Sequence, residues 1–401
     1  MLDSDRMNIL RVCYEYPPPW DGLTPGPFEL SAAQVKRGHD ILYLAGGRKS
    51  APVVTRAGIR VKRLGKAWPT YAFGPFFSFD IKVPFAIRRA LRAQPVDIVH
   101  VHGNTALWFD LFRVFGFFKD VPYVFHAHAS GIRNFKTFWE KAGPLMRIKA
   151  LFIWTLLAVQ DVLTIRTADA IISVSEKDKE IFIDSYQCPS RKIVVVENGV
   201  NTANFTISPK PSNRGLNIIM PGFLRPTKNI EKVLAVVAVL VRKGLAPHLT
   251  IVGRGDEGYI SKLKAQAKSL QIERNIVWRG YVSYPELPCI YAEHNLLLLL
   301  SHSEGLPKVI LEAFGSGLRV VSTRSFSVTG YLNEIVSWVD ETDDEETIAE
   351  AVLQAWNRSI DWDKFRREYS WEKKAEEVDR VYARVIATKI RKEPDHGASR
   401  G

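Results

Sequence analysis

The sequence is poor in cysteine and lacks a long uninterrupted hydrophobic run. Its three cysteines, Cys13, Cys188 and Cys289, are scattered and odd in number, which argues against a disulfide framework and gives no metal-ligand spacing. The most apolar window, residues 151–165, is interrupted by two polar residues and is shorter than the roughly 20 residues that span a bilayer. We therefore expect a protein of a reducing compartment, in which this window forms a buried or interfacial helix.

The first ten residues also lack the basic and apolar regions of a secretory signal peptide. No low-complexity tract suggests disorder, and 46% of the residues are hydrophobic, enough apolar material for two cores. A chain of 401 residues is too long for one ordinary core. We predict a cytoplasmic protein of two domains, with peripheral binding to the cytoplasmic membrane face left open.

Positive charge is in excess and unevenly distributed. The formal net charge is +12, and most of the excess lies in residues 51–150, a segment that is also rich in Phe and Trp. One interpretation is a solvated basic face over an aromatic core. The other is peripheral contact with anionic lipids through residues 67–165. We expect no nucleic acid partner, because no recognised binding motif accompanies the charge.

Short runs rich in Val and Ile alternate with longer stretches of helical spacing along the chain. This alternation predicts parallel sheets covered on both faces. The pattern pauses at the polar, proline-rich residues 206–215 and then resumes. We predict an α/β protein of two doubly wound, Rossmann-like domains, residues 1–207 and 208–401, with a last helix near residues 371–390 that packs back onto the first domain. Ligands of such sheets bind beyond the carboxyl ends of the strands, so two facing sheets would share a central cleft.

The stretch SHSEGLPKVILEAFGSG, residues 301–317, places two acids close together after an apolar strand. Pro307 suits the first turn of a helix, because its missing N–H and fixed φ cost nothing there. Glu304 then lies in the loop before this helix, and Glu312 projects from the helix itself. The backbone N–H groups at the helix start favour an anion such as a diphosphate.

This stretch resembles the E-x7-E signature of the retaining GT-B glycosyltransferases of family 4. The resemblance extends nearly end to end. Similar segments, in the family's order, are YEYPPPWDG (14–22) with KRGHDILYL (36–44), DIVHVHG (97–103), DAIISVSE (169–176), VENGVNTANF (196–205) and LTIVGRGDE (249–257). The resemblance implies a GT-B fold and transfer of a sugar from a nucleotide diphosphate sugar with retention of anomeric configuration.

The resemblance also assigns roles to residues of the second domain. Glu312 would bind the ribose hydroxyls, Glu304 the donor sugar near the reacting centre, and Lys228 the diphosphate. The family's arginine position holds Phe223, so either Arg225 reaches the phosphate from a shifted loop or the enzyme works with one fewer cation. The remaining residues assigned to donor binding are Gly222, Gly253, Gly305, Leu306, Pro307, Lys308 and, in the first domain, Gly22.

In the first domain the resemblance places His128 in the donor-sugar pocket, as a catalytic residue with Glu304 and Lys228. His126, His102 and Asn104 are assigned to the acceptor side. Departures occur at Asp21, which replaces a family glycine, and at residues 325–334, which replace a glycine pair and an acid. No acid or histidine cluster shows metal spacing in the sequence, so we expect a metal-independent reaction without a cofactor.

The predicted activity is that of a metal-independent hexosyltransferase that uses a UDP- or GDP-linked sugar. The expected acceptor is a hydroxyl of a lipid-linked molecule or of a polysaccharide or other glycoconjugate, as in the synthesis of cell-envelope glycans. Two alternatives remain: a non-catalytic protein that binds nucleotide sugars, and a sugar-nucleotide epimerase or phosphorylase of the same fold. The departures from the family pattern favour the first alternative, and the intact acids, lysine and histidine argue against it.

Overall fold

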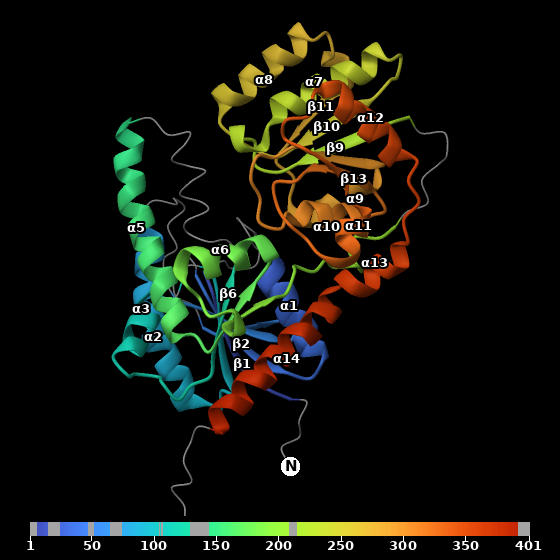
Figure 1. Ribbon diagram of the computed structural model, residues 1–401. Helices are drawn as coiled ribbons and strands as arrows, with labels where there is room; N and C mark the ends of the chain where they lie inside the picture. The colour runs from blue at the N-terminus through green and yellow to red at the C-terminus, as the bar shows by residue number, and fades with distance from the viewer. Residues whose placement is uncertain are drawn as a thin grey trace, which may run out of the picture. The chain divides into compact units, whose positions relative to one another are not determined.

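The computed structural model describes residues 6–14, 25–46, 52–64, 74–103, 105, 107–128, 144–207 and 215–391. The chain divides into two compact units (Figure 1), one formed by Met1–Glu197 with Glu372–Gly401 and the other by Asn198–Trp371. This division precedes the boundary predicted at residues 207 and 208. The last helix, predicted near residues 371–390, spans Trp371–Ile390 and groups with the first unit after its first residue.

The first unit is built on one mostly parallel sheet. Within the described residues its strand order is β3 (Val54–Arg56), β4 (Ile59–Arg63), β2 (Asp40–Ala45), β1 (Asn8–Cys13), β5 (Ile98–His102), β6 (Tyr123–Ala127), β7 (Ala170–Ser173) and β8 (Ile193–Val195). β3 pairs with β4 in the antiparallel sense, whereas the other pairs are parallel. The sheet therefore has one edge at which the carboxyl ends of the parallel strands meet.

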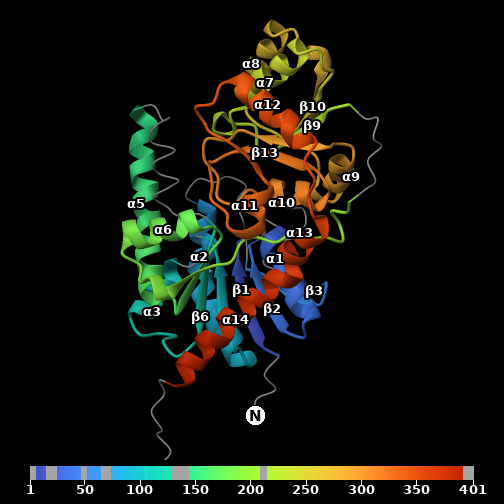
Figure 2. The same cartoon turned by 45° about the vertical axis from the view of Figure 1, so that its right-hand side comes forward.

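Helices cover both faces of the first sheet. Alternate residues of a strand point to opposite faces, so Leu10 and Val99 join an apolar core with α2, α3, α5 and α6. Arg11 and His100, next to them in sequence, face the other way and contact Tyr382 of α14. Both views place α14 against β1 and β2 (Figures 1 and 2). The helices are α1 (Pro25–Lys36), α2 (Gly74–Ala93), α3 (Leu107–Val114), α5 (Pro144–Thr167), α6 (Glu176–Tyr186), the short η1 (Ser190–Lys192) and α14 (Trp371–Ile390).

The second unit contains a fully parallel sheet. Within residues 215–371 its strand order is β11 (Ile276–Gly280), β10 (His248–Val252), β9 (Asn217–Pro221), β12 (Leu296–Leu299), β13 (Arg319–Thr323) and β14 (Ser337–Val339). β12 is the leucine run of the sequence, and all of its side chains are buried. A strand that is apolar on both faces requires cover on both faces, and the helices of this unit supply it.

One face of the second sheet packs against α7, α8 and α12 in a continuous aliphatic core, and α10 contacts β12 and β13. The helices are α7 (Ile230–Arg242), α8 (Glu257–Ser269), α9 (Leu287–Ala292), α10 (Lys308–Gly315), α11 (Gly330–Ile335), α12 (Glu345–Trp356) and α13 (Trp362–Tyr369), with the short η2 (Pro226–Lys228), η3 (Glu273–Asn275) and η4 (Tyr284–Glu286). These two units confirm the predicted fold class, an α/β chain with two doubly wound parallel sheets.

The described residues contain no helix long and apolar enough to cross a membrane.

Candidate functional site

The predicted catalytic pair of the second unit forms an ion pair. Lys228 ends η2, which follows β9, and Glu304 lies in the loop after β12, so both belong to the carboxyl edge of the sheet. The Nζ of Lys228 donates to Oε1 of Glu304 at 2.5 Å, and both side chains are mostly shielded from solvent. The amide of His302 also donates to the carbonyl of Thr227 at 2.9 Å. The two loops are thus joined by backbone as well as by charge.

Glu312 is buried, in contrast to an ordinary surface acid on a helix. Its side chain belongs to α10 and is 7% exposed. Tyr291, from α9, donates its hydroxyl to Oε2 of Glu312 at 3.0 Å. Burial and the neighbouring carboxylate hold the pKa of Tyr291 well above its usual range, so Tyr291 is a hydrogen-bond donor at any physiological pH. No sequence pattern indicates Tyr291, because the contact depends on how α9 packs against α10.

Two glycines close the neighbouring loops with backbone contacts. Gly222 follows β9 and Gly253 follows β10, and the amide of Gly222 donates to the carbonyl of Val252 at 2.9 Å. A Cβ atom on Gly253 would lie 1.8 Å from the carbonyl oxygen of Gly222. Both positions, which the resemblance assigns to donor binding, therefore shape the loop that leads to Lys228.

The departure at Phe223 has a structural counterpart. Phe223 is exposed, and the guanidinium of Arg225 lies over its ring at 4.9 Å from the centroid. Arg225 is also exposed, and the structure gives it an aromatic neighbour rather than the Lys228 and Glu304 pair.

The loop before α10 has the form expected from Pro307, which stands immediately before the first helical residue, Lys308. Leu306 and Pro307 are buried, whereas Gly305 and Lys308 are partly exposed. The side-chain amide of Asn198 donates to the carbonyl of Leu306 at 3.5 Å. The start of α10 is therefore fixed next to Glu304, with its first backbone N–H groups at the carboxyl edge of the sheet.

The histidines of the first unit form a stack at the ends of β5 and β6. His102 and His126 are paired in register, and both are buried, while His128 is partly buried just past β6. The rings of His126 and His128 are stacked with centroids 4.8 Å apart, and His100 stacks on His126 at 5.4 Å. Burial, followed by the charges of neighbouring groups, holds the pKa values of His100, His102 and His126 well below the usual range. These three imidazoles are neutral at physiological pH.

This cluster is a grouping that the sequence analysis did not find. His100, His102 and His126 each have one ring nitrogen within 4.8 Å of those of the other two, which is close enough to consider them as ligands of one metal ion. An imidazole binds a metal in the plane of its ring, however, and the ring of His126 is stacked at 6° to that of His100 and 25° to that of His102. The rings would have to rotate before three nitrogens could hold one ion.

Further residues of the first unit were not predicted at all. Arg11, 0% exposed, lies with its Nη1 3.2 Å from Nε2 of His102. Tyr382 of α14 contacts both Arg11 and Nδ1 of His100. A charged residue in the middle of the apolar strand NILRVC was the one available signal for Arg11. The predicted Gly22 and Asn104 lie outside the described residues.

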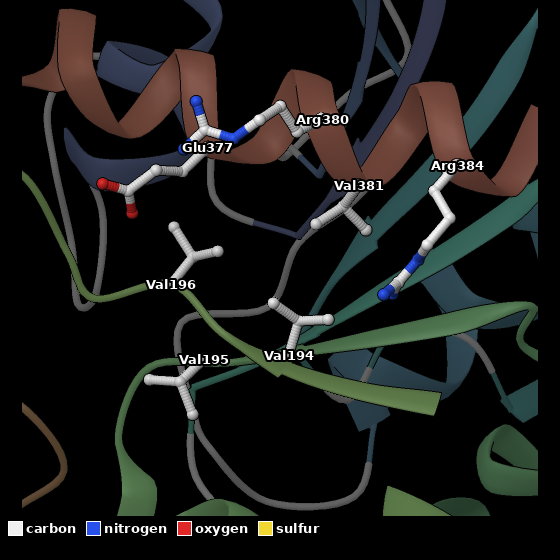
Figure 3. Close-up of a pocket in the computed structure, with 7 residues that line it drawn as sticks. All are labelled: Val194, Val195, Val196, Glu377, Arg380, Val381 and Arg384. Atoms are coloured by element: carbon white, nitrogen blue, oxygen red, sulfur yellow. The ribbon is translucent and has the colours of Figure 1, made fainter. Parts of the chain in front are cut away.

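An open pocket of about 450 Å³ also lies in the first unit, between β8 and α14 (Figure 3). Its wall is apolar on the strand side, formed by Val194, Val195 and Val196, and mixed on the helix side, which contributes Glu377, Arg380, Val381 and Arg384. None of the predicted site residues lines this pocket. A binding or catalytic site is indicated by convergent polar groups rather than by volume, so this pocket is not part of the candidate site.

Comparison with known proteins covers most of the chain. The family model described as glycosyltransferase family 4 matches residues 21–204, and the model described as glycosyl transferases group 1 matches residues 204–376. The two matches meet at residue 204. The predicted resemblance is therefore confirmed for both parts of the chain.

Individual relatives are distant. A phosphatidylinositol N-acetylglucosaminyltransferase subunit of Arabidopsis thaliana is 22% identical over 96% of this chain and 84% of its own. The UDP-Gal:alpha-D-GlcNAc-diphosphoundecaprenol alpha-1,3-galactosyltransferase of Escherichia coli is 23% identical over 70% of this chain and 72% of its own. Among solved structures, sucrose-phosphate synthase from Thermosynechococcus elongatus superposes with a TM-score of 0.74 at 16% identity, covering 96% of this chain and 100% of that one. This last likeness supports the GT-B fold.

Proposed function

Because the chain belongs to the GT-B glycosyltransferases, with family 4 and group 1 sequences in its two parts, we propose that it is a retaining hexosyltransferase. It takes a sugar from a nucleoside diphosphate, UDP or GDP, and transfers it to a hydroxyl of a lipid-linked acceptor or other glycoconjugate. The observation that carries this proposal is the Lys228 and Glu304 ion pair in the loops after β9 and β12, together with the buried Glu312 on α10, the helix that follows the second loop. These three residues bring a cation and two carboxylates to the carboxyl edge of the second sheet.

The donor's charges suit these groups. The ammonium of Lys228 and the N–H groups at the start of α10 would hold the diphosphate, on which negative charge grows as the glycosidic bond breaks. Glu312, already accepting from Tyr291, would accept from the ribose hydroxyls. When the donor binds, the diphosphate would take over part of the contact that Lys228 makes with Glu304. Glu304 would then bind the sugar. The positive charge comes from the protein itself, so the proposed reaction needs neither a metal ion nor a cofactor.

The proposed chemistry is a front-face substitution. The bond between the anomeric carbon and the diphosphate oxygen breaks, and the acceptor oxygen bonds to the same face of that carbon. The acceptor's proton passes to the departing diphosphate, so no protein base is required. The first unit would supply the acceptor-binding residues, and His128, His126 and His102 remain the proposed candidates there.

A lipid-linked acceptor is favoured by the relatives and by one surface of the first unit. The names of the Arabidopsis thaliana and Escherichia coli relatives both state a lipid or a diphosphoundecaprenol-linked acceptor. Phe85 of α2 is 60% exposed, and Phe115 and Phe117, just after α3, are 72% and 54% exposed. Arg88 and Arg89 of α2 are exposed on the same helix. We propose peripheral contact of a cytoplasmic enzyme with an anionic membrane through this surface.

The experiment that tests the donor site compares UDP-, GDP- and ADP-sugars by saturation-transfer NMR and thermal shift. The wild type should bind one nucleotide class, and Glu312→Gln should lose about tenfold or more in affinity, because a hydrogen bond to a charged group contributes about 1.5–3 kcal/mol. Glu350→Gln, an exposed acid of α12, is the matched control and should bind as the wild type does.

The outcomes separate the alternatives. No binding of any nucleotide sugar by the wild type would overturn the proposal. Binding without turnover on any acceptor would favour a non-catalytic binding protein. Conversion of the donor without an acceptor would indicate an epimerase, and a requirement for free phosphate would indicate a phosphorylase.

A further inference from the structure

A continuous chain of polar side chains runs through the first unit from α14 to His128. Nε2 of Gln34 donates to Oδ1 of Asp379 at 2.7 Å, and Oε1 of Gln34 accepts from Nη2 of Arg11. Nη1 of Arg11 lies 3.2 Å from Nε2 of His102, and Nδ1 of His102 lies 3.1 Å from Nε2 of His128. Arg11 and Gln34 are 0% exposed and His102 is 2% exposed, so water does not compete for the contacts among these three residues.

The hydrogen bonds of this series of side chains have a fixed donor-to-acceptor direction at the α14 end. Asp379 also accepts from Nε of Arg37 at 2.7 Å and pairs with Nε2 of His39 at 3.0 Å. Burial alone would raise the pKa of Asp379, but the hydrogen bonds from His39, Gln34 and Arg37 outweigh it and lower the pKa. An ionised carboxylate only accepts. The amide nitrogen of Gln34 must therefore face Asp379, and its oxygen must face Arg11.

The direction is fixed again at Arg11, because a guanidinium has donors and no acceptor. Nε2 of His102 must accept from it, which places the single proton of neutral His102 on Nδ1. That N–H then donates to Nε2 of His128. Since Nε2 of His128 is an acceptor, the proton of His128 also lies on Nδ1.

We propose that Arg11 is a positioning residue that sets both His102 and His128 as neutral imidazoles protonated on Nδ1. In this state neither nitrogen of His128 offers a lone pair to substrate, because Nε2 accepts from His102 and Nδ1 carries the proton. His128 can then donate a hydrogen bond but cannot act as a general base. This consequence rests on the proposed function, in which His128 meets a sugar hydroxyl and the diphosphate receives the acceptor's proton.

The tautomers are measurable without any substrate. Long-range ¹H–¹⁵N NMR of the full chain labelled with ¹⁵N-histidine distinguishes a protonated from an unprotonated ring nitrogen, and signals are assigned by single histidine replacements. We expect both His102 and His128 to show protonated Nδ1 and unprotonated Nε2 near neutral pH. A protonated Nε2 on either residue, whether as the other tautomer or as imidazolium, overturns the proposal.

Variants test the donor-to-acceptor direction of the hydrogen bond between His102 and His128. His102→Asp replaces the Nδ1–H donor by an acceptor and should move the proton of His128 to Nε2, whereas His102→Asn retains an N–H donor and should leave it on Nδ1. Tyr382→Phe removes a different partner of Arg11, 3.1 Å from Nη2, and should leave both tautomers unchanged. An unchanged His128 in a folded His102→Asp protein would contradict the proposal.

The wild-type and Tyr382→Phe spectra decide the matter if His102→Asp does not fold. The result is also independent of donor binding. Absence of nucleotide-sugar binding would overturn the proposed function and leave the tautomer assignment standing. A different tautomer would overturn the assignment and leave the proposed function standing.

Discussion

Asp80 and Asp110 are buried carboxyl groups among α2, α3 and α5. Asp110 is fully buried and accepts from the hydroxyls of Thr164, at 2.5 Å, and Thr167, at 2.7 Å. Burial nevertheless raises the pKa of Asp110 to about 6, and burial together with the charge of Asp110 raises the pKa of Asp80 well above its usual range. The folded state therefore holds these protons more tightly than the unfolded chain does.

This predicts a stability that falls as pH rises. For Asp110 the protonated form stabilises the fold fully below its ordinary pKa of 3.8, and this stabilisation is lost as pH rises through about 6. Between pH 4.5 and pH 7.5 the free energy of unfolding should therefore fall by about 2 kcal/mol from Asp110 alone. The measurement is urea unfolding of wild type and Asp110→Asn between pH 4.5 and pH 7.5.

The comparison with Asp110→Asn is needed because other carboxylates act in the opposite sense. The pKa of Asp379 is lowered, so its contribution is lost as pH falls. Asp110→Asn cannot titrate, and the difference between its unfolding free energy and that of the wild type should therefore change with pH. Parallel curves for the two proteins would show that Asp110 does not titrate in this range.

At the scale of elements, Gly253 controls the contact between the loops after β9 and β10. Its φ is +145°, and a Cβ atom would meet the fixed backbone of Gly222 rather than a flexible side chain. Gly253→Ala should therefore destabilise the second unit by about 3 kcal/mol or more and should weaken nucleotide-sugar binding by shifting the loop that carries Lys228. Unfolding and donor titration measure the two effects.

Gly244 separates steric clash from backbone strain. It also has a positive φ, +82°, but a Cβ atom there would meet nothing within 4 Å. Gly244→Ala should cost only the conformational strain, about 1 kcal/mol, and should leave donor binding unchanged. If the two alanine variants were equally stable, the close approach of Gly222 and Gly253 would not limit this loop.

The elements that follow from local sequence were predicted well. A leucine run bounded by polar residues became β12, and Pro307 marked the start of α10, because both signals depend on a few neighbouring residues. The histidine stack depends instead on register: His102 pairs with His126 only once β5 and β6 are aligned. Alternation within each strand indicates a shared face, but it does not give the alignment.

Contacts between distant segments were the least predictable part of the site. Gln34 and Asp379 are separated by 345 positions in the sequence, and no spacing rule relates them. A buried arginine in an apolar strand indicates that acceptors exist nearby without identifying them. Similarly, the substitution of Phe223 for the family's arginine was visible in the sequence, whereas its contact with Arg225 depends on the fold of the loop.

At the scale of the whole molecule, the charge of +12 leaves open whether cations serve solubility or binding. The exposed aromatic residues indicate where on the surface cations would serve binding. In both views α2, α3 and α5 stand together at one side of the first sheet (Figures 1 and 2). The rings of Phe85 and Phe112 lie 6.0 Å apart, and those of Phe112 and Phe117 lie 5.5 Å apart. An apolar surface that joins two elements in this way, beside cations, is suited to a lipid headgroup region.

We therefore expect the protein to bind vesicles containing phosphatidylserine at low salt and to bind neutral vesicles weakly. Arg88→Gln with Arg89→Gln should reduce binding by about thirtyfold, since each cation near an anionic surface contributes roughly 1 kcal/mol, and should reduce its salt dependence. Lys268→Gln with Arg274→Gln removes the same charge from exposed positions of the second unit and should have little effect. Vesicle sedimentation measures all three proteins. Equal losses in the two double variants would mean that net charge alone drives binding, because a localised surface requires the loss to depend on position.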